Sequence, residues 1–510
     1  MNKLRDTQSI CPECYEVLPA EVFERDNKVW IKKTCPKHGD FEEIYWSDYE
    51  MYKKAESFDR KARAIENPQV TKENPNCPKD CGLCKNHKSF STLTNIAVTN
   101  RCDLSCWYCF FFAQKTGYVY EPTMEQIRKM METVRNEKPI QCNGLQITGG
   151  EPTVREDLID IVKMAKELGF NHIQVNTDGI KISQSAELVQ NLKNAGANVF
   201  YLSYDGTTPQ TNPKNHWEIP NVIENCRKAD MHVVLVPTVI KGVNDHDLGN
   251  ILRFAGQNND TIRAVNFQPV SLVGRMPKKE RDKSRITIPD TIKKIEEQTN
   301  GEFAREDFYP IPVALPISQF VEAMTGKPQY EFGSHFACGM ATYAVNDGTK
   351  YIPMPRFFDH VGFFEYLDEA TEELRSGKNK AAVSAKALYK LNSFIDKKKA
   401  PADLKLGKLL YNVLIKHDYD ALGEFNKKTL FIGMMHFMDG YNYDIQRVQQ
   451  CCIHYAVPDG RVIPFCTFNV MPELYRDKIQ KEFSVSIEEW EKQNGRKLTD
   501  DLYKRVLPKE

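Results

Sequence analysis

The central part of the chain, from residue 93 to about residue 275, alternates short apolar runs with amphipathic stretches. Six of these runs are rich in β-branched residues, which is typical of strands covered on both faces. They span residues 95–99, 144–148, 172–177, 199–205, 232–240 and 264–270. We therefore predict six parallel strands joined by helices.

Two of the intervening helices have clear boundaries. Thr123 and Gln126 are spaced as a capping box, and apolar residues recur on one helical face over 124–134. A second apolar face covers 158–168, and Gly169 ends it. The repeated strand–helix pattern predicts an α/β fold, a partial (β/α)6 barrel. Functional residues of such sheets lie at the C-terminal ends of the strands.

The length of the chain, 510 residues, is too great for one compact core. A cysteine-rich start and a linker rich in charge and proline precede the strand–helix region, and a long segment follows it. We predict a metal module at 1–55, a linker at 56–92, the barrel at 93–300 and a C-terminal domain at 301–510.

Composition excludes some classes of protein. Lys plus Arg and Asp plus Glu both number 69, so the chain lacks the basic excess of a nucleic-acid-binding protein. It shows neither the order of a secretion signal nor the ~18 apolar residues of a membrane span, and we expect a cytoplasmic protein. Its 15 cysteines would then stay reduced. Their short spacings favour metal or iron–sulfur ligation over disulfides.

The first module carries two metal-knuckle patterns. "CPEC" provides Cys11 and Cys14, a strand-like "VWIKKT" follows, and "CPKHG" provides Cys35 and His38. Two knuckles joined by a hairpin suit one tetrahedral Zn or a rubredoxin-type Fe. The fourth ligand stays open between His38 and a later cysteine.

Two cysteine triplets share one spacing, C-x3-C-x2-C. Cys102, Cys106 and Cys109 directly follow the first predicted strand and so lie at the functional edge of the sheet. The other triplet precedes the sheet and consists of Cys77, Cys81 and Cys84. Position therefore assigns the barrel chemistry to the later triplet.

The second strand ends in "TGGEP", residues 148–152. Gly149 and Gly150 permit close backbone approach to a ligand, and Glu151 offers a carboxylate. Alone this is a weak signal, because glycines at strand ends are usually turns. Its position one strand after the cysteine loop gives it weight.

"CDLSCWYC" and "GGEP" together closely resemble the radical S-adenosylmethionine (SAM) superfamily, over about residues 93–275. The resemblance implies a [4Fe–4S] cluster held by Cys102, Cys106 and Cys109, with one iron left for SAM. It also implies that Tyr108 is the aromatic residue of the loop, and that the glycines and Glu151 hold the methionine amine. Looser matches suggest contacts to ribose or substrate, with ordinary strand-end hydrogen bonding as the alternative; they are Asn176, Asp178, Ser203 and Asp205.

Along the chain stand, in this order, "CPEC…CPKHG", "CPKDCGLC", "NRCDLSCWYCFFF", "PRFFDHVGFFEYL" and "CCIHY…PFC". This layout resembles the archaeal tetraether lipid synthase group, members of which have also been assigned as methyltransferases of 7,8-dihydro-6-hydroxymethylpterin. The resemblance implies one or two auxiliary [4Fe–4S] clusters, a mononuclear Fe or Zn, and a low-potential electron donor such as ferredoxin. Our leading hypothesis is the coupling of sp3 carbons of archaeal diether phospholipids into tetraethers. The alternative is methylation of the dihydropterin in methanopterin synthesis, and a minor alternative is a non-enzymatic electron-transfer or zinc-ribbon protein.

The remaining cysteines divide into candidate ligands and core residues. Four thiols beyond the barrel suffice for one auxiliary cluster; they are Cys338, Cys451, Cys452 and Cys466. The triplet at 77–84 is expected to hold another, with His87 as a candidate fourth ligand. Cys142 and Cys226 are left out of the ligand sets, and Cys226, in a helical stretch, is interpreted as a small buried hydrophobe.

Apolar segments in the C-terminal half bear on the substrate. Residues 356–367 and 430–438 are rich in Phe and Met, which suits either an apolar channel or an ordinary core. A stripe of leucines flanked by lysines at 405–416 predicts a helix that either packs on its own domain or lies on a membrane surface. A lipid substrate would favour peripheral contact with the inner membrane face.

Overall fold

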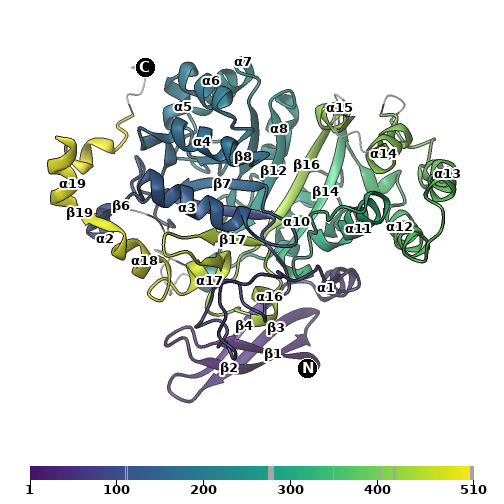
Figure 1. The fold of residues 1–510 in the computed structure, drawn as a ribbon, viewed down its shortest axis with the longest axis horizontal. Coiled ribbons are helices and arrows are strands. Elements are labelled where there is room, and N and C mark those ends of the chain that lie inside the picture. Colours follow the sequence, from purple (N-terminus) through teal and green to yellow (C-terminus); the bar gives the residue numbers. More distant parts are fainter. Residues whose placement is uncertain are drawn as a thin grey trace.

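The computed structural model describes residues 1–109, 111, 113–273, 281–347, 350–401, 404–416 and 421–505. A small N-terminal sheet lies beneath an α/β barrel, a helical lobe lies to one side, and the C-terminal helices lie on the other (Figure 1). Within these residues, no helix is both long and apolar enough to cross a membrane.

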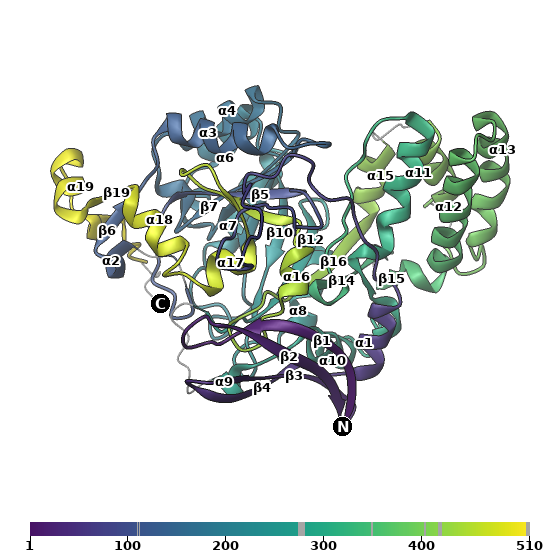
Figure 2. The ribbon, with the colours of Figure 1, turned by 60° about the horizontal axis from the view of Figure 1, so that its bottom comes forward.

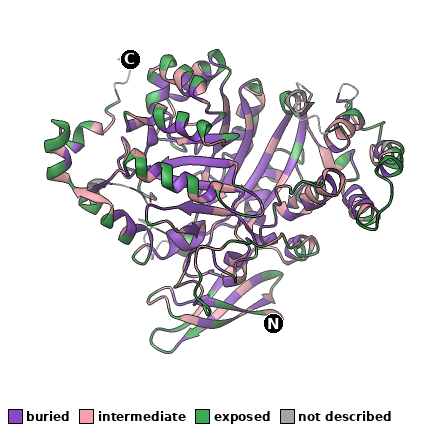
Figure 3. Ribbon diagram, viewed as in Figure 1, coloured by how far each residue is buried: buried purple, intermediate pink, exposed green. Residues whose placement is uncertain are grey.

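Six parallel strands form the centre of the main sheet, and all six match the predicted runs. The strand β5 lies beside β7, and the order continues through β8, β9 and β10 to β12. Their central residues are buried, whereas the surrounding helices expose their outer faces (Figure 3). The strands are Leu93–Thr99, Gly144–Gly149, His172–Thr177, Val199–Ser203, His232–Val236 and Ile262–Pro269; the short β11, Thr238–Val239, pairs with β12.

The helices between these strands follow the predicted boundaries. Thr123 and Gln126 form the capping box of α3, Met124–Arg135. The helix α4, Leu158–Glu167, is followed by Gly169, whose φ of +88° suits glycine. The other helices of the barrel and its continuation are α5 Ile180–Gln184, α6 Ala186–Ala195, α7 Ile219–Lys228, α8 Leu248–Gln257, α9 Arg281–Ser284 and α10 Ile288–Gln298.

The main sheet continues into the C-terminal half of the chain at both edges. The strand β16, Thr429–Met435, pairs in parallel with β12, and β14, Gly339–Asn346, pairs antiparallel with β16. At the opposite edge β17, Ile453–Ala456, pairs in parallel with β5. The sheet thus crosses residue 300, where we predict a domain boundary. The remaining strands of this sheet are β13 Tyr309–Pro310, β15 Tyr351–Pro353 and β18 Val462–Pro464.

Four antiparallel strands form the N-terminal sheet, followed by the helix α1, Tyr49–Glu56. Lys33 reaches from this sheet to the barrel side, where its Nζ donates to the carbonyls of Gly440 at 2.8 Å and Tyr441 at 2.9 Å. Arg5 forms a buried ion pair with Asp444. The strands are β1 Asn2–Ile10, β2 Val17–Arg25, β3 Lys28–Cys35 and β4 Gly39–Trp46 (Figure 2).

The helical lobe, residues 311–428, has its own apolar core. The segment 356–367 supplies Phe357 and Phe363 to that core, so these residues form a core and not a channel at the barrel. The predicted helix at 405–416 is α14, Leu406–Leu414, which buries Leu406 and Leu414 against the lobe. The other lobe helices are α11 Leu315–Thr325, α12 His360–Arg375, α13 Lys380–Leu391 and α15 Ala421–Lys428.

The last part of the chain wraps back over the barrel. The strand β19, Ser484–Ser486, pairs with β6, Tyr118–Tyr120, just beyond the cysteine loop. From α19 the chain runs towards α5 (Figure 1), and its final described residues, 498–505, form what we call the C-terminal strap. The remaining helices are α2 Ala113–Thr116, which precedes β6, and α16 Ile445–Gln449, α17 Phe465–Val470, α18 Arg476–Glu482 and α19 Ile487–Asn494.

Candidate functional site

A cavity of about 230 Å³ opens at the C-terminal ends of the parallel strands, and we call it the rim cavity. Nine of the eleven residues predicted for the barrel site line it, and they come from four consecutive strand ends. Gly149 and Asp205 are the two that are not among the lining residues. The nine are Cys102, Cys106, Tyr108, Cys109, Gly150, Glu151, Asn176, Asp178 and Ser203.

Backbone amides point at sulfur in the cysteine loop, residues 100–109. The N–H of Leu104 donates to Cys102 Sγ at 3.4 Å, and the N–H of Phe111 donates to Cys109 Sγ at 3.3 Å. Such donors stabilise thiolates that ligate iron. The three thiols therefore fit a cluster held on one side by the loop.

The two glycines of "TGGEP" bring the second strand against the cysteine loop. A Cβ on Gly149 would lie 2.1 Å from the carbonyl oxygen of Thr99, and one on Gly150 would lie 2.0 Å from that of Arg101. The N–H of Gly150 donates to Thr99 O at 2.9 Å, and that of Glu151 donates to Arg101 O at 2.8 Å. The close approach expected of these glycines is thus made to the protein's own backbone.

Three carboxyl groups gather beside Cys102. Glu151 accepts from Thr177 Oγ1 at 2.8 Å and from the N–H of Asp178 at 2.7 Å. Burial raises the pKa of Glu151 to about 7, and the neighbouring Asp103 adds to the shift. Burial and Glu151 also raise the pKa of Asp178 well above its usual range. A cationic ligand placed here would favour the ionised carboxylates.

Asn176 and Ser203 are held by protein partners. Asn176 Nδ2 donates to Thr148 Oγ1 at 3.2 Å, and Ser203 Oγ lies 2.5 Å from Lys214 Nζ. Each also lines the rim cavity, so hydrogen bonding within the protein and contact with a ligand are compatible.

The far wall of the rim cavity comes from distant segments, one of which is 430–438, predicted to line either an apolar channel or a core. Phe437 and Phe465 stack with ring centroids 4.0 Å apart. Gln268 and Asn469 add amide groups to the same cavity. Sequence reasoning missed Lys214 and Asp103. The only sequence signal for Asp103 is its position directly after Cys102.

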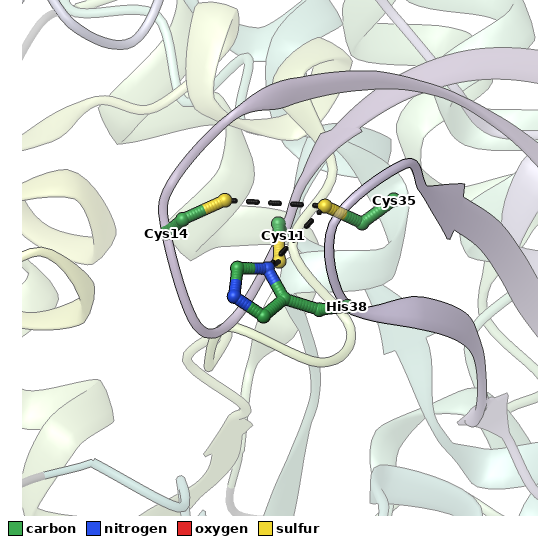
Figure 4. A group of neighbouring side chains, drawn as sticks. All are labelled: Cys11, Cys14, Cys35 and His38. Atoms are coloured by element: carbon green, nitrogen blue, oxygen red, sulfur yellow. Dashed lines mark hydrogen bonds between the residues drawn. The ribbon is translucent and has the colours of Figure 1, made fainter.

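The N-terminal knuckles converge on one point (Figure 4). Cys11 Sγ and Cys35 Sγ lie 3.4 and 3.5 Å from His38 Nδ1, and Cys14 Sγ lies 3.9 Å from Cys35 Sγ. These separations match the edges of a tetrahedron around an ion with Zn–S and Zn–N bonds of about 2.3 and 2.0 Å. Three sulfurs and one imidazole are a zinc ligand set, and the structure places His38, one of the two candidates for the fourth ligand, beside the three thiols.

The four cysteines of the C-terminal half are brought together from three segments. Cys338 precedes β14, Cys451 and Cys452 precede β17, and Cys466 lies in α17. Burial raises the pKa of the Cys451 thiol well above its usual range, and the nearby thiols of Cys466, Cys452 and Cys338 add to the shift. The group therefore fits an auxiliary cluster, and Cys466 also lines the rim cavity.

The early triplet shares a small cavity with His87. Burial and then the neighbouring thiols Cys81 and Cys84 raise the pKa of Cys77. His87 Nε2 lies 2.8 Å from Cys451 O and 3.1 Å from His454 Nε2, so this ring nitrogen is directed at the segment 451–454. Cys226 is fully buried, as expected of a small hydrophobe, and Cys142 is fully buried as well.

Family comparisons agree with this geometry. The radical SAM superfamily matches residues 96–255, and an HMPTM N-terminal zinc ribbon domain matches residues 3–47. The cysteine loop and the glycine turn at one rim of a parallel barrel are thus those of a radical SAM enzyme, a class that uses SAM and a [4Fe–4S] cluster.

One relative covers nearly the whole chain. It is the 7,8-dihydro-6-hydroxymethylpterin dimethyltransferase of Methanocaldococcus jannaschii, 46% identical over 500 residues, which are 96% of this chain and 97% of that protein. The chain belongs to the family of this protein, within the radical SAM superfamily.

More distant relatives match a smaller share of the chain. The GTP 3′,8-cyclase of Clostridium acetobutylicum is 27% identical over 220 residues, covering 42% of this chain and 64% of that protein. The crystal structure of methylornithine synthase aligns with a TM-score of 0.32 and 16% identity, over 42% of this chain and 64% of that one.

Proposed function

We propose that the chain is a radical SAM methyltransferase that acts on 7,8-dihydro-6-hydroxymethylpterin. The observation that carries this proposal is the 46% identity to the Methanocaldococcus jannaschii dimethyltransferase, which extends over 97% of that protein. The match therefore includes the N-terminal metal module and the C-terminal cysteines as well as the barrel.

The far wall of the rim cavity supports a planar, hydrogen-bonding substrate. The stacked rings of Phe437 and Phe465 offer a flat apolar surface. Gln268 and Asn469 offer amide donors and acceptors to a heterocycle. A dihydropterin has both a ring face and polar edges, so it suits this wall.

The residues of the near wall have separate tasks in this proposal. Cys102, Cys106 and Cys109 hold the cluster, and Glu151 receives the ammonium group of SAM. When bound and reduced, the cluster and SAM supply a 5′-deoxyadenosyl radical that abstracts hydrogen. A low-potential electron donor such as ferredoxin is required as a partner. Burial disfavours the ionised form of these carboxyl groups, and a cation that pairs with them would offset that cost.

The proposal is tested anaerobically with reconstituted protein, SAM and a low-potential reductant. The dihydropterin is offered together with an archaeal diether phospholipid, and both are analysed by mass spectrometry. We expect pterin products that gain one or two methyl groups, together with 5′-deoxyadenosine. Unchanged pterin beside abundant 5′-deoxyadenosine would reject the pterin substrate but keep the radical SAM class.

Lipid coupling is the second candidate, and one observation favours it. Val236, Val270 and Met438 give the rim cavity an apolar portion beyond its polar edge. A lipid chain terminus would fit there. In the same experiment this candidate predicts loss of two hydrogens from the lipid for each new carbon–carbon bond. The segment 356–367 does not contribute to this portion of the site.

A further inference from the structure

Lys214 is a buried lysine at the rim cavity that no motif marks. It lies in the loop between β9 and α7, and its side chain is 7% exposed. Its Nζ lies 2.5 Å from Ser203 Oγ, 2.6 Å from Asp205 Oδ2 and 3.0 Å from Tyr108 OH. An ammonium group has three N–H donors, so these three acceptors satisfy it.

The direction of each hydrogen bond follows from the chemistry of the partners. Asp205 Oδ1 accepts from the N–H of Thr238 at 3.0 Å, while Oδ2 accepts from Lys214 and from the Tyr108 hydroxyl. The Tyr108 hydroxyl donates to this oxygen, because a carboxylate oxygen can only accept. Both oxygens of Asp205 are thus occupied by protein donors.

The C-terminal strap fixes the backbone of Lys214 from the outside. Arg505 Nη2 donates to the carbonyl of Lys214 at 2.7 Å. The same guanidinium binds both carboxylate oxygens of Glu218, at 2.7 and 2.9 Å. Asn215 Nδ2 donates to Ser203 O at 2.7 Å. The loop is therefore held at both ends, and these contacts restrict the positions that the Lys214 side chain can take.

We infer that Lys214 is a positioning residue for the cysteine loop, acting through Tyr108. The tyrosine lies between Cys106 and Cys109, so the orientation of its ring restricts where these two thiols lie. Lys214 and Asp205 tie the tyrosine hydroxyl to the end of β9, whereas Gly149 and Gly150 tie the start of the loop to β7. This inference does not depend on the substrate, so it goes beyond the proposed function.

The experiment compares Lys214→Met and Lys214→Arg with wild-type protein, each reconstituted with iron and sulfide. We expect Lys214→Met to retain its iron but to bind SAM about tenfold more weakly, the loss of roughly one charge-assisted hydrogen bond. The change that SAM induces in the EPR spectrum of the reduced cluster should also diminish. Lys214→Arg, which keeps the cation, should recover part of both signals. The control is Lys163→Met, which removes an exposed lysine of α4.

A second variant separates positioning from charge compensation. If Lys214 only neutralised Asp205, the double variant Lys214→Met/Asp205→Asn would regain wild-type SAM affinity and EPR response, and the inference would be wrong. If Lys214 positions Tyr108, the double variant stays impaired. Tyr108→Phe removes only the hydroxyl and should reproduce the altered EPR response, which keeps the test valid if Lys214→Met fails to fold. Wild-type behaviour of Tyr108→Phe would also overturn the inference.

Discussion

The N-terminal metal site and the rim cavity both use short cysteine motifs, but they are built differently. At the N-terminus two knuckles on adjoining strands bring four donor atoms within 4.8 Å of one another. At the rim, three thiols of one loop depend on glycines, carboxyl groups and a lysine from three other strand ends. The first arrangement closes around a single ion, whereas a four-iron cluster spaces its thiolates more widely. Short local motifs are thus sufficient for the N-terminal metal site, whereas the rim cavity also requires residues from other parts of the barrel.

The variant Cys106→Ala should distinguish the two sites most strongly, because it should impair one and spare the other. This change removes one of the thiolates proposed to hold the SAM-binding cluster, so we expect no 5′-deoxyadenosine above background. The N-terminal metal should remain, because its donors lie on another sheet. Metal analysis and 5′-deoxyadenosine quantification together measure both outcomes.

The matched control is Cys226→Ala. Cys226 is a fully buried cysteine of α7 outside every cysteine group. The variant Cys226→Ala should lose some packing energy but retain all metals and SAM cleavage. Equal loss of iron in both variants would show that the barrel tolerates no cysteine change, and would remove the distinction.

A second prediction concerns the dependence of the rim on neighbouring strands. Gly150→Ala places a Cβ 2.0 Å from Arg101 O, so the cysteine loop must shift. We expect 5′-deoxyadenosine formation to fall roughly 100-fold, as a displacement near 1 Å can cause. Gly144→Ala is the control, since its Cβ would meet Thr92 O at 2.6 Å at the other end of the same strand. Both variants should lower stability, but only Gly150→Ala should weaken SAM binding.

The contrast between the two sites explains what the sequence could predict. The six strands were predicted because buried parallel strands read as continuous β-branched runs. The knuckles and the cysteine loop were visible because their residues are neighbours in sequence. Lys214 was not, because it reaches the rim cavity from a segment without a motif.

The segment 356–367 shows what the sequence could not predict. Its aromatic residues suited a channel or a core equally, since composition does not reveal which surface a helix faces. Only the packing of the helical lobe decides that they form its core. Likewise, the role of the two glycines as a contact between strand and loop follows from Cβ distances that no motif encodes.

A third prediction addresses the self-contained site. Cys14→Ser should release the N-terminal metal, because three remaining donors bind zinc much more weakly. SAM cleavage should change by about twofold or less, since distant sites behave independently. Zinc and iron analysis with 5′-deoxyadenosine formation measures this. Loss of radical chemistry together with the N-terminal metal would mean that the module supports the barrel directly.

The smallest effect on SAM cleavage is expected where the two regions meet. Lys33→Met removes the hydrogen bonds from Nζ to Ser9 Oγ, Gly440 O and Tyr441 O, leaving two buried carbonyls without this donor. We expect a loss of about 3 kcal/mol in the free energy of unfolding, with SAM cleavage retained. Lys32→Met is the control, because Lys32 points to solvent and pairs with Glu21 at 2.9 Å. Denaturant unfolding that shows equal stability for both variants would contradict the contact, whereas a separate early transition in Lys33→Met would show that this lysine holds the metal module to the barrel.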